Sequence, residues 1–315
     1  MKKLWLAAAV FFVLGLSANA HATQYTLETI SFPGAVSTGV YGINNSGDVV
    51  GSYYDGTKLH GYVFDGNDYK TIDYPGAADT SLRNINESGK VVGWYNLDGE
   101  GFGFNETYGF LYDGASYISV AFPGPFSGFS LETSMNGINN NDTVVGGYWV
   151  GGTRGFIYKD GVVTTYDSGY FEDINDNDVI VAQDVDAFWS WLVINGVEVQ
   201  FNGSEDVYEI FASGINNDGY VVGDLLDKDF STYNFIYDGN QFNRVDLPGG
   251  LLDINDSGQI VGNVFSNGTG YGYIATPVNG RVVPEPSLFL LFGLAVAGIG
   301  AGRFFIPSQR ASAAC

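Results

Sequence analysis

The chain repeats six times a ten-residue phrase, Gly42-Ile43-Asn44-Asn45-Ser46-Gly47-Asp48-Val49-Val50-Gly51 in its first copy. The Ile-Asn pair of the phrase starts at residues 43, 85, 138, 174, 215 and 254. Successive copies therefore lie 42, 53, 36, 41 and 39 residues apart. Self-similarity with a period of about 40 residues is typical of repeat architectures.

The phrase has the chemistry of a tight turn between two strands. Its sixth position is always glycine or aspartate, namely Gly47, Gly89, Asp142, Asp178, Gly219 and Gly258. Because both residue types tolerate left-handed backbone angles, we predict a turn that leads into a strand at Val-Val-Gly. A second phrase, such as His60 to Gly66, places Asp-Gly after alternating aromatic residues, which is a further hairpin signal.

Together with a third phrase, such as Ile72-Asp73-Tyr74-Pro75-Gly76, each unit offers four short strands, the size of one propeller blade. Residues 24–34 match this closing phrase although no blade precedes them, and the last unit lacks a clear fourth strand. Closing the ring with the N-terminal strand would remove the exposed sheet edges. We therefore predict an all-β fold, a six-bladed β-propeller of four-stranded blades at residues 23–280, plus a C-terminal hydrophobic helix.

The two ends of the chain have the pattern of targeting segments. Lys2 and Lys3 precede an apolar run and a small-residue cleavage site, so residues 1–22 are predicted to be a secretory signal peptide. At the other end we expect a linker with a Pro-Glu-Pro motif at 281–286, a transmembrane or sorting helix at 287–306 and a short tail at 307–315. Arginine in the tail predicts that it is cytoplasmic.

Pro284-Glu285-Pro286, the apolar helix and the trailing Arg303 together resemble the PEP-CTERM sorting signal. The resemblance covers about the last 33 residues. It implies a Gram-negative bacterium that makes exopolysaccharide, and an exosortase-type processing enzyme that cleaves near Pro-Glu-Pro. We then expect export across the inner membrane, transient anchoring by the C-terminal helix, and a final location at the cell surface or in the extracellular matrix.

The repeats between about residues 24 and 280 resemble HAF-type extracellular repeats. The His-Ala-Phe position of that family corresponds to His60-Gly61-Tyr62, and the Gly-Ile-Asn-x-x-Gly-x-Val-Val-Gly phrase is the stronger match. The resemblance implies an extracellular, β-propeller-like domain, and it carries over no established activity and no catalytic residue. We accordingly expect a protein that is not an enzyme and has no required cofactor.

The formal net charge is −22, and residues 23–283 hold 9 Lys and Arg against 34 Asp and Glu, a balance of −25. Such a surface repels nucleic acid and anionic membranes, so we expect no nucleic-acid partner. The only cysteine is Cys315, at the end of the tail. The propeller must therefore be stable without disulfides.

Calcium is the one cofactor that the turns suggest. Asp253 to Gly258 places oxygen-bearing side chains at positions 1, 3 and 5 and glycine at position 6, as at the start of a calcium loop. Three equivalent loops begin with glycine and neither acidic loop has Glu at position 12, so turn chemistry alone also explains the pattern. The calcium candidates are Asp173, Asn175, Asn177, Asp253, Asn255 and Ser257.

In a propeller, the two stereotyped turns of every blade lie on one face and the variable connections on the other. Binding residues usually lie on variable loops held by a rigid scaffold. Aromatic rings beside acids on these loops can stack on sugars and hydrogen-bond their hydroxyl groups, although they can also simply pack the loops onto the blades. The candidate ligand-binding residues are Phe102, Phe104, Phe126, Phe129, Glu100 and Glu132.

These observations favour a binding or structural module of the cell surface or biofilm matrix, with exopolysaccharide or a cell-surface glycan as its partner. One alternative is a carbohydrate-active propeller, either a lectin or a glycosidase, although no spacing singles out a pair of carboxylates. A second alternative is a calcium-stabilised adhesin.

Overall fold

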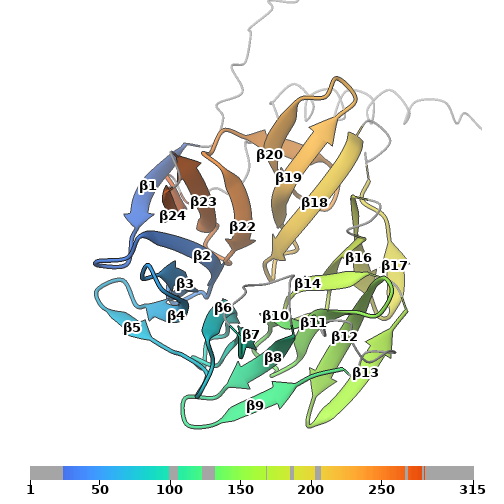
Figure 1. Cartoon of the computed structure of the whole chain (residues 1–315). Helices are drawn as coiled ribbons and strands as arrows, with labels where there is room; N and C mark the ends of the chain where they lie inside the picture. Colours follow the sequence, from blue (N-terminus) through green and yellow to red (C-terminus); the bar gives the residue numbers. More distant parts are fainter. Residues whose placement is uncertain are drawn as a thin grey trace, which may run out of the picture. The chain divides into compact units, whose positions relative to one another are not determined.

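The computed structural model describes residues 24–278 and 280, apart from 99–105, 123–131, 168, 185–187, 203–206 and 267–268. The 24 strands among these residues form six four-stranded antiparallel sheets. Figure 1 shows the six sheets arranged around a common axis. The predicted six-bladed propeller with four strands per blade is confirmed.

The first strand of each blade lies nearest the axis (Figure 1). Blade 1 consists of β2 (Ser37–Ile43), β3 (Val49–Tyr54), β4 (Leu59–Phe64) and β5 (Tyr69–Thr71). Blade 2 consists of β6 (Asp79–Ile85), β7 (Val91–Asn96), β8 (Thr107–Tyr112) and β9 (Tyr117–Val120). Blade 3 consists of β10 (Thr133–Ile138), β11 (Val144–Trp149), β12 (Thr153–Lys159) and β13 (Val162–Tyr166). Blade 4 consists of β14 (Tyr170–Ile174), β15 (Ile180–Asp184), β16 (Trp189–Ile194) and β17 (Val197–Val199). Blade 5 consists of β18 (Val207–Ile215), β19 (Val221–Asp227), β20 (Thr232–Tyr237) and β21 (Phe242–Val245).

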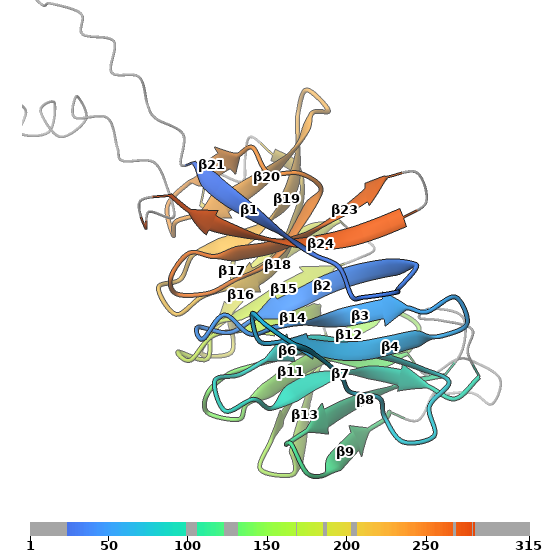
Figure 2. The ribbon, with the colours of Figure 1, turned by 90° about the vertical axis from the view of Figure 1, so that its left-hand side faces the viewer.

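Blade 6 combines the first strand of the propeller domain with its last three strands. It consists of β22 (Gly250–Ile254), β23 (Ile260–Ser266) and β24 (Thr269–Pro277), with β1 (Tyr25–Ile30) as its outer strand. β1 pairs antiparallel with β24 from Tyr25 opposite Pro277 to Ile30 opposite Gly272, and the two strands lie side by side in Figure 2. The N-terminal strand therefore closes the ring, as predicted.

The predicted left-handed turn position is also confirmed. The φ angles at the sixth position of the phrase are 59° at Asp142 and 57° at Asp178, and they lie between 76° and 88° at the four glycines. In each copy, the Ile of the Ile-Asn pair ends the inner strand. The next strand begins with Val-Val-Gly in four copies, with Ile180-Val181-Ala182 in the fourth and with Ile260-Val261-Gly262 in the sixth. The repeated phrase is thus the hairpin between the first two strands of every blade.

The hydrophobic core lies between neighbouring blades. Val50 of blade 1, for example, packs in one cluster with Leu82 and Phe110 of blade 2. The Pro-Gly phrase follows the fourth strand, and its aromatic residue stacks on a tyrosine of the next blade, as Tyr74 does on Tyr95 with ring centroids 3.6 Å apart. The repeat therefore encodes the contacts between blades as well as the strands within them.

The predicted signal peptide, linker, C-terminal helix and tail lie outside the described residues. Within the described part of the chain, no helix is long and apolar enough to cross a membrane.

Candidate functional site

The asparagine of every Ile-Asn pair links its blade to the next. Each of these six side chains exposes only 3–4% of its surface, and its Nδ2 donates to the backbone carbonyl of the equivalent asparagine one blade on, at 3.0–3.4 Å. The bonds run in sequence through Asn44, Asn86, Asn139, Asn175, Asn216 and Asn255, and Asn255 returns to Asn44. The last blade is thus bonded to the first, and the ring of hydrogen bonds is closed.

The next residue of each phrase forms a second closed ring. Its backbone N–H donates to the side-chain oxygen of the equivalent residue in the following blade, at 2.5–2.9 Å. The members are Asn45, Glu87, Asn140, Asp176, Asn217 and Asp256. These bonds occupy the polar groups of the turn face, where the axial cavity has a volume of only about 60 Å³. This face therefore offers little room for a ligand.

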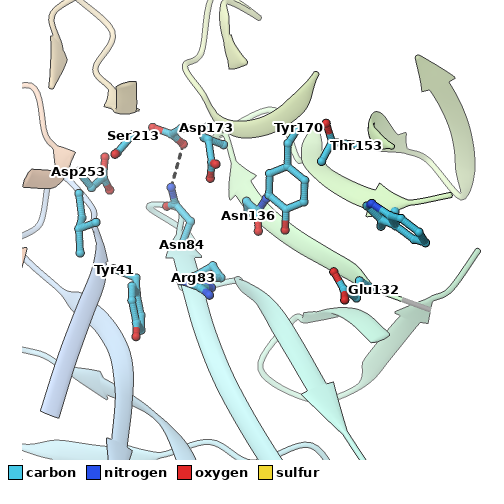
Figure 3. A pocket seen from close by; sticks show the side chains of 13 residues that line it. Tyr41, Arg83, Asn84, Glu132, Asn136, Thr153, Tyr170, Asp173, Ser213 and Asp253 are labelled. Atoms are coloured by element: carbon cyan, nitrogen blue, oxygen red, sulfur yellow. Dashed lines mark hydrogen bonds between the residues drawn. The ribbon is translucent and has the colours of Figure 1, made fainter. Parts of the chain in front are cut away.

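The first strand of every blade contains a β-bulge just before the phrase, because its register with the second strand shifts there. The extra residues that the shift inserts in the first strands are Tyr41, Arg83, Asn136, Glu172, Ser213 and Leu252. A bulge can redirect a side chain, and bulges are enriched beside active sites. All six line one central cavity of about 440 Å³, shown in Figure 3.

The cavity opens on the side of the variable connections. Its other wall residues include Glu132, Trp149 and Thr153. Glu132 directly precedes β10, Trp149 ends β11 and Thr153 begins β12, so all three lie at the ends of strands that face away from the stereotyped turns. This is the face on which we predicted ligand binding.

The floor of the cavity is formed at a position of the repeat where glycine alternates with a larger polar residue from blade to blade. The residue before each Ile-Asn pair is, in order, Gly42, Asn84, Gly137, Asp173, Gly214 and Asp253. A Cβ atom at Gly137 would lie 2.8 Å from the Cα of Asp173, and one at Gly214 would lie 2.6 Å from the Cα of Asp253. Glycine in one blade therefore allows the close approach of the larger residue in the next. Asn84, Asp173 and Asp253 line both axial cavities and separate them.

The two floor carboxyl groups are buried and belong to different blades. Asp173 accepts hydrogen bonds from Asn84 Nδ2 and from the backbone N–H of Ile215, both at 2.9 Å, and Asp253 accepts one from Ile43 N at 2.8 Å. Burial raises the pKa of Asp173 to about 7 in spite of these bonds. Burial also raises the pKa of Asp253 well above its usual value, and the neighbouring Asp173 raises it further.

The wall adds two more carboxyl groups and one cation. Burial raises the pKa of Glu172 to about 7, against the opposing effect of Arg83, and burial also raises the pKa of Glu132. The Arg83 guanidinium lies 4.4 Å from the centroid of the Tyr41 ring. The cavity thus combines aromatic surfaces with groups that both donate and accept hydrogen bonds near neutral pH.

Of the six predicted ligand-face residues, Glu132 lines the cavity. The other five, Glu100, Phe102, Phe104, Phe126 and Phe129, lie outside the described residues, as do Pro284, Glu285, Pro286 and Arg303 of the predicted sorting signal.

The calcium candidates are divided between different parts of the site. Asp173 and Asp253 meet at the floor, whereas Asn175 and Asn255 belong to the ring of interblade bonds. The Oδ1 atom of Asn175 already accepts from the backbone N–H groups of Asn177 and Val179, and Ser257 donates to Asn255. Among the described residues, no group of three or more His, Cys, Asp or Glu side chains could hold a metal ion. Calcium binding stays a prediction.

Sequence reasoning missed most of the cavity wall, including Tyr41, Arg83, Tyr170 and Glu172. A signal was nevertheless present, because the residue two positions before each Ile-Asn pair differs in all six copies, whereas the Ile-Asn pair itself is the same in every copy.

No protein-family model and no curated protein matches the chain. Among solved structures, it is similar to the Trypanosoma rangeli sialidase in complex with sialic acid, with a TM-score of 0.51 and 11% identity over 89% of this chain. The match spans 60% of that sialidase chain. A lectin of Aleuria aurantia gives a TM-score of 0.41 with 12% identity, covering 82% of this chain and 99% of the lectin. YCF48 from Cyanidioschyzon merolae gives a TM-score of 0.42 with 10% identity, and the match covers 82% of this chain and 88% of YCF48. At these identities the sialidase match supports the propeller fold alone.

Proposed function

We propose that this chain is an exported binding module of the cell surface or matrix, and that it holds a saccharide in the central cavity. The observation that carries the proposal is the set of six bulged residues, which differ in all six copies of the repeat and all line one cavity. The volume of about 440 Å³ lies within the usual range for ligand sites, about 300–1,000 Å³.

The lining suits a sugar. The rings of Tyr41, Trp149 and Tyr170 offer surfaces for the apolar face of a pyranose, and the amides and carboxyl groups of the wall can hydrogen-bond its hydroxyl groups. The opposite face of the propeller is sealed by the two hydrogen-bonded rings, which favours the variable-loop face as the entrance.

A cavity-filling variant tests this proposal. Ser213→Phe places a large ring in the cavity, and Thr164→Phe places the same ring on the exposed strand β13 as a control. We expect the full chain to bind glycans on an array, and we expect Ser213→Phe alone to abolish that binding. Retained binding by a folded Ser213→Phe protein would reject the cavity as the site.

Export and sorting are supported by the sequence patterns at the two ends. The test is Glu285→Ala, which should hold the protein in the membrane fraction of its native host if Pro-Glu-Pro directs processing. A simple C-terminal anchor would be insensitive to this change.

One observation favours glycoside hydrolysis as a second candidate function. Glu172 and Asp173, with pKa values of about 7, would have the protonation state of a general acid near neutral pH. Incubation of bound glycans with the protein distinguishes the two functions, since hydrolysis releases new reducing ends and binding alone does not.

A further inference from the structure

The charged groups that line the central cavity are unevenly divided. Among the described residues that line it, there are four carboxyl groups, from Glu132, Glu172, Asp173 and Asp253, and one cation, Arg83. The repeat domain as a whole carries a charge of −25 over residues 23–283. The cavity is therefore rich in carboxyl groups, and the net negative charge of the molecule would attract a positively charged ligand.

Arg83 offsets only part of this charge. Its guanidinium lies over the Tyr41 ring and opposes the burial that raises the pKa of Glu172. The floor carboxyl groups of Asp173 and Asp253 form no salt bridge with any residue in the described part of the chain. Their hydrogen bonds come instead from backbone N–H groups and from Asn84.

Burial without a counter-charge is costly for a carboxylate, and such a group remains protonated instead. An ammonium group at the floor would supply the missing charge and would favour the ionised form of both acids. The aromatic rings of Tyr41, Tyr170 and Trp149 around the same cavity would add cation–π attraction. Charge, burial and aromatic lining thus point to the same ligand chemistry.

We propose that the ligand of the central cavity carries an ammonium group, and that the saccharide is an amino sugar with its free amine directed at Asp173 and Asp253. This inference rests on the proposed saccharide-binding function and narrows its ligand class. Binding should also release protons, because the ammonium group replaces protons held by the floor carboxyl groups.

The test uses the full chain and matched pairs of ligands. Glucosamine, galactosamine and mannosamine are each compared with the parent hexose by isothermal titration calorimetry at low salt. Titration in two buffers of different ionisation enthalpy measures the protons released. Cyclohexylammonium and cyclohexanol form a further pair that lacks the sugar hydroxyl groups.

We expect at least one hexosamine to bind at least tenfold more tightly than its parent hexose, with net proton release. Glu172→Gln and Glu132→Gln each remove one acid from the wall and should reduce this preference severalfold. Glu28→Gln removes the same charge from the exposed strand β1 and should leave it unchanged.

The possible failures are distinguishable. If a hexose binds as tightly as its hexosamine, the ammonium inference is wrong and the saccharide proposal stands. If cyclohexylammonium binds and no hexosamine does, the charge preference stands and the saccharide proposal fails. If none of these compounds binds, both proposals are rejected.

Discussion

The closed ring of asparagine bonds predicts that one small substitution will have a large effect on stability. Asn175→Ala removes three hydrogen bonds, one from Nδ2 to the carbonyl of Asn216 and two accepted by Oδ1 from the N–H groups of Asn177 and Val179, all at 3.0 Å. Each bond contributes about 1 kcal/mol net, so we expect a loss of about 3 kcal/mol. That is a large part of the about 5–15 kcal/mol typical of a folded domain.

For a domain of this size the loss corresponds to a fall in melting temperature of about 6–12 °C. Differential scanning calorimetry of the full chain measures this value. The control is Asn177→Ala in the same turn, where the side chain is exposed and makes one bond, to the carbonyl of Asn217 at 3.1 Å. It should cost about 0.5 kcal/mol or less. Equal shifts for the two variants would refute the view that the buried asparagine of the phrase stabilises the fold.

Three further predictions concern the ring closure, the glycine positions and the buried acids. Deletion of residues 23–34 should lower the melting temperature sharply, because it removes β1 from β24; an unchanged melting curve would contradict the observed closure. Gly214→Ala should destabilise the fold by about 1–3 kcal/mol in a denaturant titration, since its Cβ would lie 2.6 Å from the Cα of Asp253; a neutral effect would mean that the two blades can separate freely. Raising the pH from 6 to 8 should lower the melting temperature. The pKa values of Glu172 and Asp173 are higher in the folded protein than in the unfolded chain, so the stability that these groups contribute is complete below their pKa values in the unfolded chain. It is lost as the pH rises through about 7, their pKa in the folded protein. Glu172→Gln should reduce that slope, and an unchanged slope would exclude Glu172 as a source.

Much of the fold could be predicted from the sequence because the deciding interactions are local or repeated. Glycine or aspartate at the sixth position of the phrase reports a left-handed turn, and the structure has φ values of 57–88° there. Residues 24–34 match a strand that is missing at the other end, and β1 completes blade 6. Each inference needs only the chemistry of one turn, or one comparison between copies.

The cavity could not be predicted in the same way, because its wall depends on the register between strands. Whether the side chain of Glu172 points into the core, into solvent or toward the axis is decided by the bulge between Phe171 and Asp173. A shift of one residue reverses the two faces of a strand, and no local residue preference reports it. The sequence pattern points instead to the aromatic residues of the variable loops. Glu132 belongs to both sets, because it lies where a loop meets the first strand of its blade.

The bulged residues and the repeated asparagines differ in what they contribute to the fold. The repeated asparagines satisfy their own hydrogen-bonding groups in closed rings, so changing one of them leaves buried groups unpaired. The bulged residue is outside the strand ladder and faces a cavity, so it can be Tyr, Arg, Asn, Glu, Ser or Leu without loss of a backbone bond. A chain with the same phrase and other residues at these six positions should therefore keep this propeller and bind a different ligand.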